Sequence, residues 1–165
     1  MVDFIFRRRS IRRFTGEPIG EEAVTTLLEA AMAAPSSNNR KPWHYVVIQQ
    51  RFTLDRLAEV HPYGGMLHEA GLAIAVCADP RISPNGWVLD CSAATENILL
   101  AAPALGLGAC WLGCHPYEER KASIRRVLHI PRQIEILSLV AVGHPGEDKE
   151  PRTQYDSGRI HRERW

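Results

Sequence analysis

Four segments of the chain carry the alternation of apolar and polar residues that is typical of amphipathic helices. The clearest covers residues 21–34, where Val24, Leu27 and Leu28 recur at helical spacing and Pro35 sets the end. Charged residues cover the opposite side of this segment, so one face should pack on a core. The helices predicted in this way cover residues 21–34, 53–60, 87–105 and 118–130.

Four shorter segments are rich in β-branched, aromatic or continuously apolar residues, which is typical of strands. Residues 71–79 (GLAIAVCAD) are apolar almost without interruption, which indicates a strand buried on both faces. The predicted strands cover residues 44–50, 71–79, 108–114 and 134–144. Mixed helices and strands over 165 residues predict one layered domain, either α+β or α/β.

The predicted helix over residues 87–105 is apolar on nearly every side in its second half, so we expect it to be covered from several directions. Pro103 should bend it or end it. The helix also carries Asp90 and Glu96. These carboxylates lie six positions apart, too loosely paired for glycosidase-like acid–base chemistry.

The character of the chain changes after Gly143. Residues 145–165 are polar and rich in turn formers, with only Tyr155, Ile160 and Trp165 as spaced apolar anchors. Such a segment cannot bury itself in a core of its own, so it is either disordered or an arm laid over another surface.

Composition narrows the class of protein. A formal net charge of +1 argues against a general binder of polyanions, which needs a large basic excess. The four cysteines form no regular framework, which favours reduced thiols over a disulfide scaffold. The N-terminal residues lack the pattern of a signal peptide, and no run of 18 apolar residues is present. These features predict a cytoplasmic protein with neither a membrane nor a nucleic acid as its partner.

A cluster of arginines near the N-terminus is the first candidate for chemistry. Five of them surround Ser10 in the stretch RRRSIRR, at Arg7, Arg8, Arg9, Arg12 and Arg13. If this segment is helical, Arg8 and Arg12 share a face. The cluster is either a solvated basic stretch or a phosphate clamp, because guanidinium groups and a serine hydroxyl suit phosphate oxygens.

The loop APSSNNRKPW (residues 34–43) is the second candidate. Ser36, Ser37 and Asn39 supply neutral donors and acceptors that suit a ribityl chain or the edge of a heterocycle, while Trp43 anchors the loop. The same residues also make a good helix-to-strand connection, and the loop by itself does not separate the two interpretations.

Two other patterns are weaker. Cys110 and Cys114 beside His115 lack the second ligand pair of a structural zinc site, so we expect no metal. Gly106 and Gly108 lack the full dinucleotide fingerprint and follow a predicted helix, which disfavours a Rossmann site.

Four stretches together resemble the nitroreductase family of flavin-dependent oxidoreductases. They are RRRSIRRF, APSSNNRKPWHYVVI, DCSAATENILLAAPALGLGACWLG and GHPGEDKEPR. They occur in the order and spacing of the family, and the resemblance extends from Phe4 to Trp165. Each stretch is weak evidence when taken singly, and the four in combination are specific.

The resemblance implies a fold and an assembly. It implies an α+β, three-layer fold with a central, mostly antiparallel sheet flanked by helices, in a single FMN-binding domain over residues 1–165. It also implies a homodimer that exchanges a C-terminal arm, residues 145–165, and binds one FMN at each of two subunit interfaces.

The resemblance assigns groups of residues to the cofactor. Arg8, Arg9 and Ser10 match the segment that grips the phosphate, and Arg12 matches the cation near the pyrimidine edge of the flavin. The remaining matches are the partner-subunit loop (Pro35, Ser36, Ser37, Asn39), the strand end beside the isoalloxazine (Leu112, Gly113) and a second phosphate contact (Arg152, with Lys149 as the weaker candidate).

The implied activity is transfer of reducing equivalents from NAD(P)H to a small acceptor, such as a nitroaromatic or a quinone, in a ping-pong mechanism. No side chain is needed as a nucleophile, because the cofactor performs the hydride transfer. Arg12 would stabilise the negative charge that reduced flavin carries near N1 and O2. Other flavin chemistry (reductive dehalogenation or flavin breakdown), a flavin store or sensor without turnover, and a nucleic-acid-binding arm remain alternatives.

Overall fold

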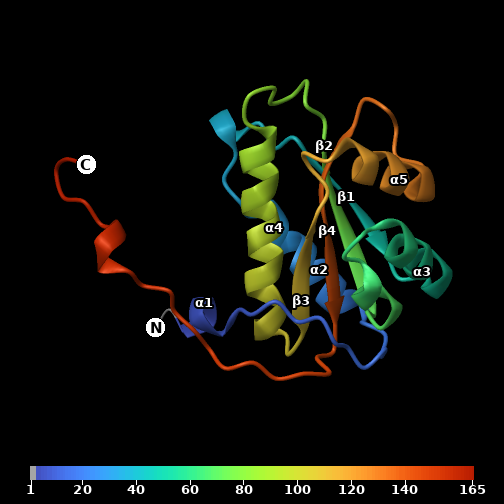
Figure 1. Ribbon diagram of the computed structural model, residues 1–165. Helices are drawn as coiled ribbons and strands as arrows, with labels where there is room; N and C mark the ends of the chain where they lie inside the picture. Colours follow the sequence, from blue (N-terminus) through green and yellow to red (C-terminus); the bar gives the residue numbers. More distant parts are fainter. Residues whose placement is uncertain (1–2) are drawn as a thin grey trace.

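The computed structural model describes residues 3–165 and is built on one four-stranded sheet (Figure 1). The strand order is β1-β2-β4-β3, and every neighbouring pair is antiparallel. The strands are β1 (Trp43–Ile48), β2 (Leu72–Ala78), β3 (Gly108–Gly113) and β4 (Glu135–Gly143). β1 and β3 therefore form the two edges of the sheet.

Helices cover both faces of the sheet (Figure 1). Two pack on one face and two on the other, each pair around its own apolar core. The first pair is α2 (Glu21–Met32) and α4 (Trp87–Ala104), and the second is α3 (Arg51–Val60) and α5 (Glu118–Leu128). The short elements are α1 (Asp3–Arg7) and the 3₁₀ turns η1 (Ser37–Asn39), η2 (Gly65–His68) and η3 (Ser157–Arg159).

Strand β2 shows why the sheet needs two layers of helices. Leu72, Ile74 and Val76 point into the core under α2 and α4, whereas Ala73 and Ala75 point into the core under α3 and α5. All seven residues of β2 are buried, as the uninterrupted apolar run predicts. The expected three-layer α+β fold is confirmed.

The predicted elements are confirmed, with small shifts at their ends. The helix expected over residues 118–130 ends at Leu128, because His129 adopts a left-handed conformation with φ 53°. The helix expected over residues 53–60 begins two positions earlier, at Arg51. α4 ends one residue after Pro103, as this proline predicts.

The N-terminal segment after α1 follows the start of β3 and the end of β4. The backbone N–H of Ile11 donates to the Ala109 carbonyl (3.0 Å), and Thr15 donates to the carbonyl of His144 (3.1 Å). This approach requires a glycine in the sheet, since a Cβ added at Gly108 would lie 2.7 Å from the Ile11 side chain. Because helix α1 ends at Arg7, Arg8 and Arg12 do not share a helix face, and the conditional expectation fails.

The C-terminal segment first runs beside this N-terminal segment and then leaves the body of the protein (Figure 1). Gly146 donates to the Arg13 carbonyl (2.8 Å), and Arg152 donates to the Phe6 carbonyl (3.1 Å). Every residue from 150 to 165 is exposed, including the apolar side chains of Tyr155 and Trp165. The segment therefore contributes nothing to the core of its own chain.

Candidate cofactor site

Basic side chains gather where the N-terminal segment meets the C-terminal one. The Lys149 ammonium donates to the Ser10 carbonyl (2.7 Å) and lies 3.0 Å from the Glu147 carboxylate. Glu147 also accepts the backbone N–H of Arg12 (2.6 Å). These contacts tie residues about 135 positions apart in the sequence into one cluster.

The cluster lies around the first half of β3. Burial raises the pKa of the Cys110 thiol, and the nearby positive charges of Arg12, Lys149 and Arg8 oppose that rise. Arg8 also reaches helix α4, where its guanidinium lies 3.6 Å from the Glu96 carboxylate. Three of the predicted phosphate or ring contacts are therefore neighbours in one chain.

Arg9 and Arg152 are placed differently. Arg9 donates to the Glu150 carbonyl and lines a cavity of about 220 Å³ together with Ile11 and Pro103. Arg152 is exposed, and its backbone is anchored beside α1 through Phe6. Both arginines thus border the cluster, and Glu147 and Lys149 line the same cavity as Arg9.

Strand β3 is an edge strand, and the side of its backbone that faces away from β4 pairs with no other strand of the sheet. Cys114, directly after the strand, donates to the Leu137 carbonyl (3.0 Å), and the Ala109 carbonyl accepts from the N-terminal segment on the opposite side. Because hydrogen bonding alternates along an antiparallel pair, Trp111 and Gly113 direct their backbone groups away from β4. The edge from Ala109 to Gly113 is ~13 Å long, at ~3.3 Å per residue.

Gly113 borders open space at the end of this edge. A Cβ added there would meet no heavy atom within 4 Å, and its φ lies outside the left-handed region. Neither packing within the chain nor backbone conformation therefore requires a glycine here. The preceding Leu112 is buried in the core under α3 and α5, so it contributes to the edge through its backbone position.

The Pro35–Asn39 loop lies at the other end of α4. The Ser37 backbone N–H donates to the Asp90 carboxylate (2.8 Å), and the Ser36 hydroxyl accepts from the Lys41 backbone (3.0 Å). Asn38, Asn39 and Lys41 all adopt positive φ, between 51° and 56°. A non-glycine residue in this region is strained, and such strain clusters at functional loops.

The structure therefore brings part of the predicted site together within one chain. Arg8, Ser10, Arg12 and Lys149 converge at the start of β3, with Leu112 and Gly113 at the end of the same strand. The loop is separate, beside the first turn of α4 (Figure 1). Within residues 3–165, no hydrogen bond or ion pair joins the loop to the basic cluster.

Four residues that position these groups were not predicted as part of the site. Asp90 and Glu96 were recognised only as loosely paired carboxylates, yet the first holds the loop and the second pairs with Arg8. His61 and Arg120 both bond to the Gly113 carbonyl. Their distance from Gly113 in the sequence left no local signal for either.

The described part of the chain has neither clustered metal-binding side chains nor a helix able to span a membrane. Residues 3–165 contain no group of three or more His, Cys, Asp or Glu side chains arranged to hold a metal ion. All four cysteines are buried free thiols, and burial raises the pKa of Cys77, Cys91 and Cys114 to about 12. No helix over the same residues has the length and apolar character needed to cross a membrane.

Comparison with known proteins identifies the family. The nitroreductase family model matches residues 5–61 and 59–144, which is most of the chain. The chain belongs to the nitroreductase family. A protein of Archaeoglobus fulgidus, provisionally named NADH dehydrogenase/NAD(P)H nitroreductase, is 46% identical over 170 residues, covering 99% of this chain and 98% of its own.

Solved structures of other nitroreductase-like proteins have the same fold as this chain. One from Parabacteroides distasonis, with the same provisional name, is 40% identical with a TM-score of 0.96, and covers 99% of this chain and 98% of its own. A protein from Desulfovibrio desulfuricans, provisionally named a nitroreductase and solved in complex with FMN, is 32% identical with a TM-score of 0.86. That match covers 99% of this chain and 96% of the other.

The residues of this chain fit an FMN group. A phosphate needs cations and hydrogen-bond donors, which Arg8 and Lys149 supply around Ser10, while Arg12 lies close by as a cation for the ring. A planar ring system needs open space beside a backbone edge, which the strand provides from Trp111 to Gly113. Charge and open space lie along one strand, which is the arrangement that an elongated anionic cofactor requires.

Proposed function

We propose that the chain is an FMN-dependent oxidoreductase that passes reducing equivalents from NAD(P)H to a small acceptor, such as a nitroaromatic or a quinone, in two alternating half-reactions. The open edge of β3 beside the basic cluster carries this proposal. It is supported by membership of the nitroreductase family and by a relative solved with FMN.

In this proposal, the N-terminal and C-terminal segments hold the phosphate. Arg8, Arg9 and Ser10 would contact it from one segment, and Lys149 and Arg152 from the other. The hydrogen bond between Lys149 and the Ser10 carbonyl keeps the two segments together. Guanidinium and ammonium groups bind phosphate strongly because their hydrogen bonds are charge-assisted.

Arg12 and the edge of β3 would orient the ring system. FMN, when bound, supplies the redox chemistry, accepting two electrons from NAD(P)H and passing them on. Arg12 would place a positive charge beside the pyrimidine edge, and the backbone of Leu112 and Gly113 would lie along the isoalloxazine. The protein thus binds and orients the cofactor, and needs no nucleophile of its own.

The loop of Pro35, Ser36, Ser37 and Asn39 would act on the cofactor of the neighbouring subunit. Its separation from the basic cluster within one chain supports this role. Exposed apolar side chains on α1 (Phe4, Ile5, Phe6) and at Leu89 of α4 supply a surface for a second copy of the chain. The functional unit in this proposal is a homodimer.

Spectroscopy of the purified protein tests the function. We expect a yellow protein that releases FMN and not FAD, that NADH or NADPH bleaches without oxygen, and that a quinone or nitroaromatic re-oxidises. A protein that stays colourless after incubation with FMN would contradict the assignment. Bleaching by NAD(P)H without re-oxidation by any acceptor would indicate a flavin store.

A further inference from the structure

The Gly113 carbonyl receives two side-chain hydrogen bonds at the open end of β3. His61 Nε2 lies 3.1 Å from this oxygen, and Arg120 Nη1 donates to it over 3.1 Å. His61 directly follows α3, while Arg120 belongs to α5. Two elements of the same layer therefore converge on one backbone atom of the edge strand.

The histidine is a neutral donor with a defined tautomer. The backbone N–H of Tyr63 donates to His61 Nδ1 (3.2 Å), so Nδ1 has no proton and Nε2 carries it toward the Gly113 carbonyl. Only 2% of His61 is exposed. Burial lowers the pKa of His61, and the charge of Arg120 acts in the same direction, whereas the bond to Gly113 opposes them.

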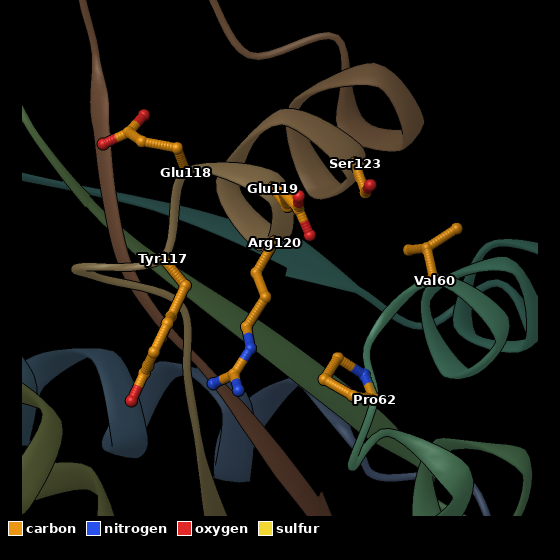
Figure 2. Close-up of a pocket in the computed structure, with 7 residues that line it drawn as sticks. All are labelled: Val60, Pro62, Tyr117, Glu118, Glu119, Arg120 and Ser123. Atoms are coloured by element: carbon orange, nitrogen blue, oxygen red, sulfur yellow. The ribbon is translucent and has the colours of Figure 1, made fainter.

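The arginine side chain contacts two aromatic rings. Its guanidinium carbon lies 3.8 Å from the ring centroid of Tyr117 and 5.3 Å from that of Tyr63. Figure 2 shows the side chain reaching from α5 between Tyr117 and Pro62, along a cavity of about 480 Å³. Contacts with two rings reduce the freedom of a long side chain and restrict the direction of its hydrogen bond.

Within the described residues, no carboxylate forms a salt bridge with Arg120 that would neutralise its positive charge. The neighbouring Glu118 pairs with Lys121 instead (2.7 Å). Across residues 3–165, no Asp or Glu lies within salt-bridge distance of the Arg120 guanidinium. Its charge therefore acts on the end of β3, where the missing Cβ of Gly113 leaves open space.

We propose that His61 and Arg120 are positioning residues for the flavin, with Arg120 also acting as a second redox-tuning cation at the end of the site opposite Arg12. Two donors on one carbonyl restrain a glycine at a strand end, which would otherwise have wide conformational freedom. A cation near the ring stabilises the reduced, more negative cofactor over the oxidised one. The inference rests on the proposed binding of FMN along β3.

Potentiometry of the holoenzyme tests the charge of Arg120. We expect Arg120→Gln to lower the preference for reduced over oxidised FMN about tenfold, equal to a midpoint potential about 30 mV more negative. The matched control is Arg126→Gln, because Arg126 is an exposed arginine of the same helix that contacts Ser123 and not Gly113. The control should keep the wild-type potential.

Equal potentials for the Arg120 and Arg126 variants, with FMN bound to both, would overturn the tuning role. That outcome differs from failure of the proposed function, in which the wild-type protein itself binds no FMN.

A pair of amide variants tests His61. The side-chain nitrogen of glutamine can take the place of Nε2, whereas that of asparagine stops one bond shorter. We expect His61→Gln to keep the FMN dissociation constant within twofold, and His61→Asn to weaken binding at least fivefold and shift the visible flavin spectrum. A folded His61→Asn protein with wild-type affinity and spectrum would overturn the positioning role.

Discussion

Gly113 is expected from the family resemblance to lie beside the isoalloxazine, and the structure leaves open space at this glycine. An added Cβ meets nothing within 4 Å there, whereas at Gly108 it would approach the Ile11 side chain to 2.7 Å. Both glycines lie in β3, and neither has a positive φ. One glycine is therefore required by packing within the chain, and the other leaves room for a ligand.

This contrast predicts opposite outcomes for two alanine variants. Gly113→Ala should leave the free energy of unfolding of the FMN-free protein unchanged or raise it by up to ~1 kcal/mol, while weakening FMN binding. Gly108→Ala should lower the free energy of unfolding by about 1–3 kcal/mol, because the Ile11 segment must move. Urea unfolding and FMN titration of both variants check this. Normal FMN affinity in Gly113→Ala would remove Gly113 from the site.

Arg8 is either a solvated surface arginine or a residue that binds the FMN phosphate, and the two roles predict different effects of its replacement. Its pairing with Glu96 over 3.6 Å is partly exposed and contributes little stability by itself. We expect Arg8→Ala to weaken FMN binding by about 1.5–3 kcal/mol, the range for hydrogen bonds to charged groups. Isothermal titration measures the change, with the exposed Arg13→Ala as the control. Equal dissociation constants for the two variants would show that Arg8 is a solvated surface residue.

At the scale of elements, α4 connects the separate parts of the site. Its first turn holds the Pro35–Asn39 loop through Asp90, and its middle holds the N-terminal segment through Glu96. Asp90 is 3% exposed and also accepts the Ser83 hydroxyl (2.9 Å). A buried carboxylate with two donors in different loops fixes both loops to the helix.

Replacing Asp90 should therefore loosen the loop. We expect Asp90→Ala to lower the free energy of unfolding by about 2–4 kcal/mol, since two donors lose a charged acceptor. Asp90→Asn retains one acceptor oxygen and should lower the free energy of unfolding by a smaller amount. Hydrogen exchange at the Ser37 amide, measured with urea unfolding, reports on the loop directly. Unchanged protection of that amide in Asp90→Ala would show that the loop is held by other contacts.

At the scale of the whole molecule, the C-terminal segment has no core to join within its own chain. Its apolar side chains are solvent-exposed, and Trp165 is 100% accessible. Because Tyr155, Ile160 and Trp165 are not buried within their own chain, they are free to pack on another subunit. We therefore retain the expectation of an arm that crosses a dimer interface larger than about 2,000 Å².

Deleting everything after Gly146 tests this arm. We expect the truncated protein to lose FMN and to dissociate or aggregate, because Lys149, Arg152 and the apolar anchors are all removed. A second truncation ending at Arg152 keeps both basic residues and should retain more flavin than the shorter chain. Light scattering of the three proteins reports their assembly, and their flavin content reports how much FMN each retains. A yellow dimer from the shortest chain would exclude Arg152 from the site.

The order of elements followed from the sequence pattern, and the three-layer arrangement followed from the resemblance to the family. The apolar run of β2 indicated burial on both faces, and Pro103 indicated where α4 ends. These features are local, because periodicity and the missing N–H of proline act on nearest neighbours in the chain. The resemblance to the family also named the segments that form the basic cluster.

Only the tertiary structure decided how those segments meet. Whether RRRSIRR forms a helix depends on the edge of β3, which accepts Ile11 and draws the segment into extended backbone. His61 and Arg120 both bond to Gly113, although the first lies 52 positions before it in the sequence and the second 7 positions after it. Neither separation forms part of a periodic pattern. Sequence pattern encodes which face of an element is buried, whereas contacts between distant elements arise from packing and appear only when the layers are assembled.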